Sequence, residues 1–125
     1  MVIRELIKKT AQTLTNSGKE NALFDAQQII RHVFSFTAIQ LVQNYETDAS
    51  EHVKEVTKLA LRRASGEPLQ YILGTQEFMS LEFFTHKNVL IPRQDTETLV
   101  ECVLENTKDC TTFLDIGWLF RICLY

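Results

Sequence analysis

Residues 66–74, GEPLQYILG, mark the point where the helical pattern of the sequence gives way to a mixed one. Gly66 is expected to end the helix before it, because glycine readily adopts the left-handed conformation that follows many helices. Pro68 suits a first helical turn, where its missing N–H would have no partner. We therefore expect a short helix over residues 69–73, ended by Gly74.

The residues before this stretch predict a helical bundle. Apolar residues recur at helical spacing between residues 3 and 14, from about 22 to 34, and from about 48 to 64. A short helix is expected over residues 38–44, with Thr37 as its N-cap. The second helix should turn the following side chains inward: Leu23, Ala26, Ile29, Ile30 and Val33. Residues 1–75 thus predict a small antiparallel bundle.

The residues after Gly74 predict strands and one further helix. Residues 77–79 and 81–85 hold aromatic and β-forming side chains around a polar break, which indicates a hairpin within a linker spanning residues 76–92. A helix is expected from Asp95, capped by Asp95 or Thr96, and a strand over residues 111–116. The side chains expected to bury one face of that helix are Leu99, Val100, Val103 and Leu104. The fold class is therefore mainly α.

Composition limits the classes of function. The chain has 125 residues and a formal net charge of −3, which argues against a nucleic-acid backbone as main partner. Its three cysteines form no CxxC pair and indicate reduced thiols in a cytoplasmic protein. The three histidines are scattered and predict no metal site. No apolar run approaches the length of roughly 18 residues that spans a membrane.

Three segments together carry a resemblance to a known family. GEPLQYILG at residues 66–74, LIPRQDTETLVE at 90–101 and LFDAQQIIRHV at 23–33 are similar to segments of the HemK-type protein-(glutamine-N5) methyltransferases. The likeness covers residues 1–117 and concerns the N-terminal part of those enzymes. It implies a helical bundle, a β-hairpin linker and a Rossmann-like methyltransferase domain, of which residues 93–117 would be the start. Residues 118–125 do not match.

The resemblance also implies an activity and a cofactor. The family transfers a methyl group from S-adenosylmethionine to the glutamine of the Gly-Gly-Gln motif in peptide chain release factors, which act in translation termination. Asp115 and Gly117 match the start of its glycine-rich methyl-donor loop. Arg93, Thr96 and Glu97 match a motif near the donor pocket. This chain departs from the motif at residue 94, where a glutamine stands in place of a proline.

The helical bundle is expected to help dock the release factor, and three charged residues are candidates. Asp25 could contact the partner or serve as a favourable charge in the first turn of its helix. Arg62 and Arg63 could bind the partner or complete a solvated helix end.

Two departures from the family pattern limit what these 125 residues should do. Residues 118–121, WLFR, lack the glycines that let the donor loop approach its ligand. The Asn-Pro-Pro-Tyr motif that holds the substrate amide is missing, since the two prolines, Pro68 and Pro92, stand in other contexts. We expect a truncated or frame-shifted product with no catalytic residues of its own, inactive alone and not binding S-adenosylmethionine.

Two other readings remain open. The chain could be a stand-alone module that binds release factor or ribosome without chemistry. It could also be a fragment of a nucleic-acid amino-methyltransferase, although its acidic charge and family-like bundle argue against that class.

Overall fold

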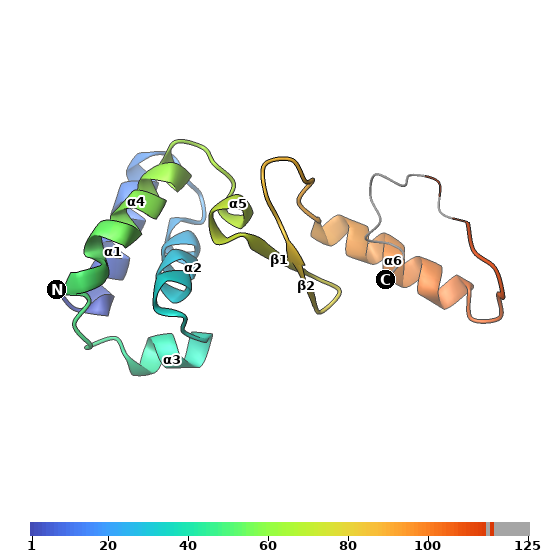
Figure 1. Ribbon diagram of the computed structural model, residues 1–125, viewed down its shortest axis with the longest axis horizontal. Coiled ribbons are helices and arrows are strands. Elements are labelled where there is room, and N and C mark those ends of the chain that lie inside the picture. Colours follow the sequence, from blue (N-terminus) through green and yellow to red (C-terminus); the bar gives the residue numbers. More distant parts are fainter. Residues whose placement is uncertain (115, 117–125) are drawn as a thin grey trace. The chain divides into compact units, whose positions relative to one another are not determined.

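The computed structural model describes residues 1–114 and 116, and the chain divides into two compact units at the Leu73–Gly74 bond. The first unit, Met1–Leu73, holds five α-helices (Figure 1). The second begins at Gly74 and holds a two-stranded hairpin and one helix among its described residues. The mainly α fold class is thereby confirmed.

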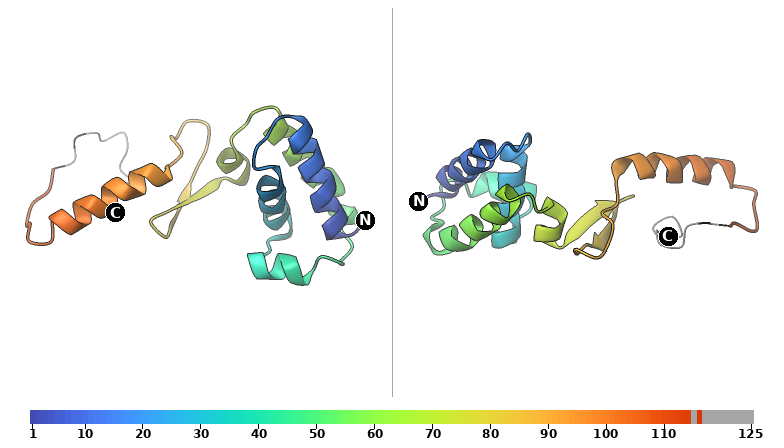
Figure 2. Two further views of the ribbon diagram at one scale, coloured as in Figure 1. Left: turned by 180° about the vertical axis from the view of Figure 1, so that it is seen from behind. Right: turned by 90° about the horizontal axis from the view of Figure 1, so that it is seen from above.

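The first unit is a small bundle. Its helices are α1 (Ile3–Asn16), α2 (Ala22–Phe34), α3 (Ala38–Gln43), α4 (Val53–Ala64) and α5 (Leu69–Leu73), and a 3₁₀ turn at Ser50–His52 leads into α4. α1, α2 and α4 lie side by side and contact one another (Figure 2). The short α5 packs on α4 and α2. The bundle and its five helices agree with the prediction, which rested on apolar spacing for the three long helices and on cap, proline and glycine signals for the two short ones.

The core of the first unit is built from aliphatic side chains of all five helices. Its buried members include Ile3, Leu6 and Ile7 of α1, Ile29 and Ile30 of α2, Leu41 of α3, Val56 of α4 and Leu69 of α5. A smaller cluster unites Leu14, Ala22 and Ala26. Each fully buried leucine or isoleucine contributes about 1.5–3 kcal/mol relative to exposure. This repeated burial holds the five helices together.

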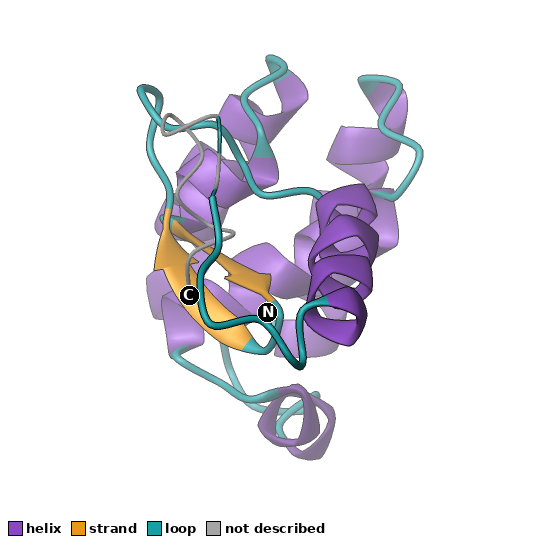
Figure 3. Cartoon of the chain, turned by 90° about the vertical axis from the view of Figure 1, so that its right-hand side faces the viewer, coloured by secondary structure: helices purple, strands orange, loops and turns teal. Residues whose placement is uncertain are grey.

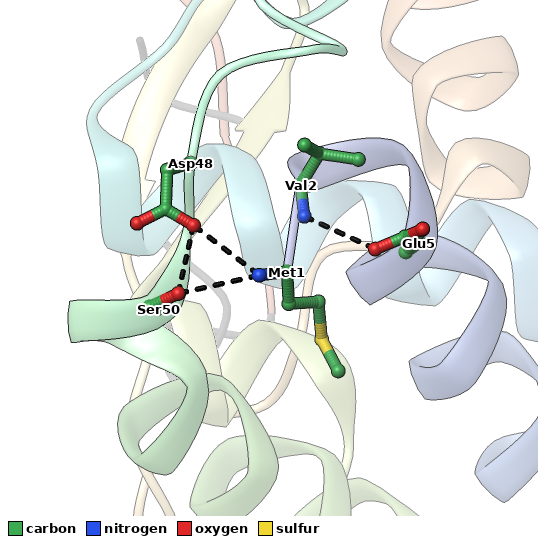
Figure 4. A network of polar contacts seen from close by, with 5 residues as sticks. All are labelled: Met1, Val2, Glu5, Asp48 and Ser50. Carbon is green, nitrogen blue, oxygen red and sulfur yellow. Dashed lines mark hydrogen bonds and ion pairs between the residues drawn. The ribbon is translucent and has the colours of Figure 1, made fainter.

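The beginning of the chain is joined to the segment before α4 (Figure 4). The α-ammonium of Met1 lies 3.3 Å from Asp48 Oδ1, to which the Ser50 hydroxyl also donates a hydrogen bond of 2.7 Å. The hydroxyl and, after it, the ammonium hold the pKa of Asp48 below its usual range. Backbone bonds reinforce the contact, with Ala49 N donating to Met1 O at 2.8 Å.

Two details of the bundle differ from prediction. α4 begins at Val53 and not near Asp48, because residues 47–49 pair with the start of the chain and so cannot be helical. Leu23, expected to face inward, is exposed, and Ala22 is buried instead. Leu23 lies about 100° further round the helix than Ala22, which places it beside the buried face.

The second unit opens with an antiparallel hairpin of β1 (Thr75–Phe78) and β2 (Leu81–Phe84), drawn in orange in Figure 3. Met79 and Ser80 form its two-residue turn, with φ of 50° and 62°. Positive φ at both central residues is typical of a type I′ turn, whose twist matches that of the strands. Met79, expected in the first strand, therefore belongs to the turn.

The aromatic side chains of the hairpin divide between its two faces. Phe78 is buried and meets Phe83 edge to face, with 6.2 Å between ring centroids. Phe84 is 86% exposed, since neighbouring strand residues point to opposite faces.

The helix of the second unit is α6 (Gln94–Asn106). It begins one residue earlier than predicted, so that Arg93 is its N-cap and neither Asp95 nor Thr96 holds that position. No residue of α6 is buried, and Leu99 and Leu104 are exposed. Val100 and Val103 are half-buried, so the predicted burial of one face is only partial in the described structure.

The predicted strand over residues 111–116 is not formed where the structure describes it. Residues 111–114 and 116 are irregular, and Asp115 lies outside the described residues. A strand needs a neighbour for its backbone groups, and the two described strands pair with each other. Among the described helices, none is both long and apolar enough to cross a membrane.

Candidate functional site

Asp25 and Arg63, two of the predicted docking residues, form an ion pair with each other. Asp25 lies in the first turn of α2 and is 4% exposed. Its Oδ2 accepts a hydrogen bond of 2.7 Å from Nε of Arg63, in the last turn of α4. Arg63 Nη1 also donates to the backbone oxygen of Glu67 at 3.2 Å. This pair therefore joins α2, α4 and the loop that leads to α5.

Arg62, the third predicted docking residue, pairs with Glu67 in a two-pronged contact. Its Nε and Nη2 donate to the two carboxylate oxygens of Glu67 at 2.8 and 2.6 Å. These hydrogen bonds lower the pKa of Glu67 and raise that of Arg62. Planar guanidinium–carboxylate pairs of this kind fix orientation as well as charge.

The backbone at Gly66 makes this arrangement possible. Gly66 has φ of 107°, a conformation that side chains disfavour. The N–H of Glu67 donates to the carbonyl of Arg62 at 3.3 Å, and that of Gly66 to Arg63 at 3.1 Å, which closes the end of α4. The chain thereby reverses and returns Glu67 to Arg62.

A comparison with known protein families matches the first unit, which includes these charged residues. Residues 5–74 match the family model of the PrmC N-terminal domain, more than half of the 125 residues. The chain belongs to this family.

Curated relatives of this PrmC N-terminal domain extend the likeness. The release factor glutamine methyltransferase of Geobacter sulfurreducens is 38% identical over 116 residues, which cover 92% of this chain and 41% of that protein. That of Buchnera aphidicola subsp. Schizaphis graminum is 37% identical over 119 residues, covering 94% and 42%. A bifunctional methyltransferase of Rickettsia bellii is 36% identical over 104 residues, covering 82% and 19%. The chain spans about two-fifths of the first two relatives, and the resemblance stated from the sequence motifs is confirmed.

The PrmC N-terminal domain match and the first compact unit end together. The match stops at Gly74, one residue beyond the unit that ends at Leu73. The GEPLQYILG stretch thus closes the family domain, and the pairs made by Arg62 and Arg63 fasten its first residues to α4.

Three of the donor-binding candidates, Arg93, Thr96 and Glu97, lie at the start of α6. Glu97 Oε1 accepts a hydrogen bond of 2.9 Å from the N–H of Met79 in the hairpin turn. Arg93 Nη2 lies 3.9 Å from Asp95 Oδ2, and both side chains are largely exposed. The Thr96 N–H donates to the Arg93 carbonyl. The described contacts of these three candidates are thus with the chain itself.

The remaining donor candidates, Asp115 and Gly117, lie outside the described residues. The assignment of residues 93, 96, 97, 115 and 117 to donor binding stays a prediction, as does docking by Asp25, Arg62 and Arg63. Within residues 1–114 and 116, no three His, Cys, Asp or Glu side chains gather as metal ligands. Cys102 and Cys110 are free, exposed thiols.

Sequence reasoning missed the pairing of these charges, although one signal was present. Asp25 stands next to Ala26 and three and four residues from Ala22 and Ile29, so helical spacing places it on the buried face of α2. A buried carboxylate needs a partner, which pointed to a cation elsewhere. Nothing in the sequence identified Arg63, which is 38 residues away.

Proposed function

We propose that this chain is the N-terminal, substrate-docking part of an S-adenosylmethionine-dependent methyltransferase that methylates the Gly-Gly-Gln glutamine of peptide chain release factors. The observation that supports this most is the family match over residues 5–74, together with relatives that are named release factor glutamine methyltransferases. The chain aligns with about two-fifths of those proteins, so the whole activity is assigned to the longer protein.

The two units have different roles in the proposed function. The helical bundle, residues 1–75, binds the release factor, and the hairpin linker, residues 76–92, connects it to the start of the methyltransferase domain at residues 93–117. S-adenosylmethionine supplies the methyl group in the full-length enzyme, where Asp115 and Gly117 belong to its donor loop. The 125 residues have no Asn-Pro-Pro-Tyr motif to hold the substrate amide, so they bind without methylating. With a release factor as partner, the protein works in the cytoplasm.

A binding and a methylation measurement on the same samples test this function. The chain is titrated with a bacterial release factor, with and without S-adenosylmethionine, and the Gly-Gly-Gln peptide is then analysed by mass spectrometry. We expect saturable binding that does not depend on S-adenosylmethionine, and no methylated glutamine. Absence of binding at both low and physiological salt would refute the docking role, and methylation by the purified chain would refute its inactivity.

A further inference from the structure

The outward side of α4 carries a shallow, open hollow of about 620 Å³. Lys54, Thr57, Lys58, Leu61 and Arg62 are among the residues that line it, and all belong to this one helix of the first unit. The buried residues of α4, Val56 and Ala60, lie on its other side. Of the residues that line the hollow, Val53 packs partly against the core, and the others named here are not among the side chains of the core.

Cations dominate this face. Lys54, Lys58 and Arg62 follow one another at intervals of four residues and so share one side of the helix. Arg62 is paired with Glu67, whereas Lys54 and Lys58 form no ion pair with any described residue. No acidic residue lines the hollow. In a chain whose net charge is −3, this face has the opposite sign.

An apolar side chain stands among these cations. Leu61 is 57% exposed and lies between Lys58 and Arg62 in the lining. Interfaces commonly combine an apolar centre with charged groups around it. A leucine with cations beside it therefore suits a segment that has carboxylates near an apolar side chain.

Two other kinds of ligand suit the face less well. Small-molecule sites have similar volumes but enclose most of the ligand between several elements, whereas this hollow is open and is lined by one helix. Nucleic-acid sites gather many Lys and Arg side chains around the phosphates, whereas only two unpaired lysines line this hollow.

We propose that the outward face of α4 docks an acidic segment of the release factor, with Lys54 and Lys58 facing its carboxylates and Leu61 contacting an apolar side chain. This assignment rests on the proposed function and gives the docking surface a location. The two lysines raise the rate of encounter and select the partner by charge. Leu61 slows dissociation by burying apolar surface.

The test compares two double charge reversals in the 125-residue chain. Lys54→Glu with Lys58→Glu alters the proposed face, and Lys8→Glu with Lys9→Glu makes the same change of charge at exposed positions of α1. Association and dissociation rates with a bacterial release factor are measured by surface plasmon resonance between about 50 and 300 mM salt. Far-UV circular dichroism and thermal melting confirm that each variant is folded.

We expect the α4 variant to associate about tenfold more slowly at low salt and to lose most of its salt dependence. The association rate of the α1 variant should stay within about twofold of that of the unaltered chain, since the positions changed lie outside the interface. Lys54→Gln with Lys58→Gln should fall between the two, and Leu61→Ala should mainly raise the dissociation rate.

The outcomes separate this inference from the function on which it rests. If the unaltered chain binds and the α1 and α4 variants lose the association rate equally, the proposal that α4 is the docking surface is overturned, whereas release-factor docking itself is not. Lack of binding by the unaltered chain would overturn both. Tighter binding of a single-stranded RNA oligonucleotide that depends on Lys54 and Lys58 would overturn the acidic-segment proposal in favour of phosphate recognition.

Discussion

Asp25 and Arg63 form the least exposed ion pair among the described residues, and their removal should cost more than that of a surface pair. Arg63→Met leaves the buried Asp25 carboxylate without its partner, which should lower the free energy of unfolding by about 3 kcal/mol. Arg4 pairs with Glu46 at 3.1 Å, but these side chains are 56% and 69% exposed. Arg4→Met should cost less than about 1 kcal/mol.

Urea unfolding followed by circular dichroism measures both losses. Asp25→Asn combined with Arg63→Met should recover part of the loss, because the uncompensated charge is removed. Equal destabilisation by Arg63→Met and Arg4→Met would contradict the structural role of the buried pair.

Glu97 is expected to hold the hairpin turn, whose two central residues adopt left-handed conformations without being glycine. Such residues are strained, and the bond from the Met79 N–H to the Glu97 carboxylate compensates for part of that strain. Glu97→Ala should speed amide hydrogen exchange at Met79 by about tenfold, whereas Glu97→Gln, which keeps a carbonyl oxygen, should have a smaller effect.

A hairpin turn whose central residues adopt left-handed conformations without strain provides the control for the Glu97 variant. Met79→Asn with Ser80→Gly gives a sequence that favours the type I′ turn, so Glu97→Ala should then disturb the flanking amides of the hairpin less. An unchanged effect of Glu97→Ala on those amides in this background would show that the carboxylate does not offset turn strain.

Local polar contacts were predictable at this scale, and distant ones were not. The expected cap at Thr37 is present, since its hydroxyl accepts a bond of 3.2 Å from the Gln40 N–H three residues on. The partner of Asp25 depends on how α2 and α4 pack. The partner of Glu97 depends on how the start of α6 lies against the hairpin turn. Helical spacing and cap rules describe neighbours in sequence and hold no information on either contact.

At the scale of elements, the loop between α4 and α5 should make stability depend on pH. Arg62 lowers the pKa of Glu67 from its ordinary value of 4.5 in the folded chain. Well above pH 4.5 the Glu67 carboxyl is ionised in both the folded and the unfolded chain, and its pairing with Arg62 stabilises the fold fully. As the pH falls below 4.5 the unfolded chain takes up the proton first, so this stabilisation is lost progressively until the folded pKa is passed.

Glu67→Gln should therefore flatten the acid limb of the pH–stability curve, measured by urea unfolding between about pH 3 and 6. Arg62→Gln should flatten it similarly, and the double variant should add little because both act on one pair. A limb that is unchanged in Glu67→Gln would show that the pair does not contribute to acid sensitivity.

The ends of elements were predictable where the signals lie within a few residues. The bounds of α5 agree with the expected range, because Gly74 follows it, and those of α2 agree with the range expected from apolar spacing. The start of α4 was misplaced because residues 47–49 bond to the chain start, a contact across more than 40 positions. Apolar spacing along the helix holds no information on that pairing.

At the scale of the whole molecule, the bundle should fold without the second unit. Its clusters of buried side chains, from Ile3 to Leu69, come entirely from residues 1–73. A fragment of residues 1–73 should unfold in one cooperative thermal transition, within a few degrees of the corresponding transition of the 125-residue chain. Non-cooperative melting of the fragment would show that residues beyond Leu73 are needed for the core.

The buried side chains of the first unit were predicted better than those of the second, and the packing within each unit explains why. In the bundle, each amphipathic face finds its complement within residues 1–73, so apolar spacing identified the core apart from details such as Leu23. α6 shows the same kind of spacing, but Leu99 and Leu104 stay exposed in the described structure. Periodicity identifies which face of a helix is apolar and does not identify what covers it.

Docking by the bundle is tested by comparing the affinity of a bacterial release factor for residues 1–73 with its affinity for the 125-residue chain. Isothermal titration calorimetry on both proteins at the same low and physiological salt gives the two dissociation constants. A docking bundle predicts constants within about threefold of each other, since the interface would lie within the first unit. Binding by the longer chain with none by a folded 1–73 fragment would contradict docking by the bundle and would place the contact beyond Leu73.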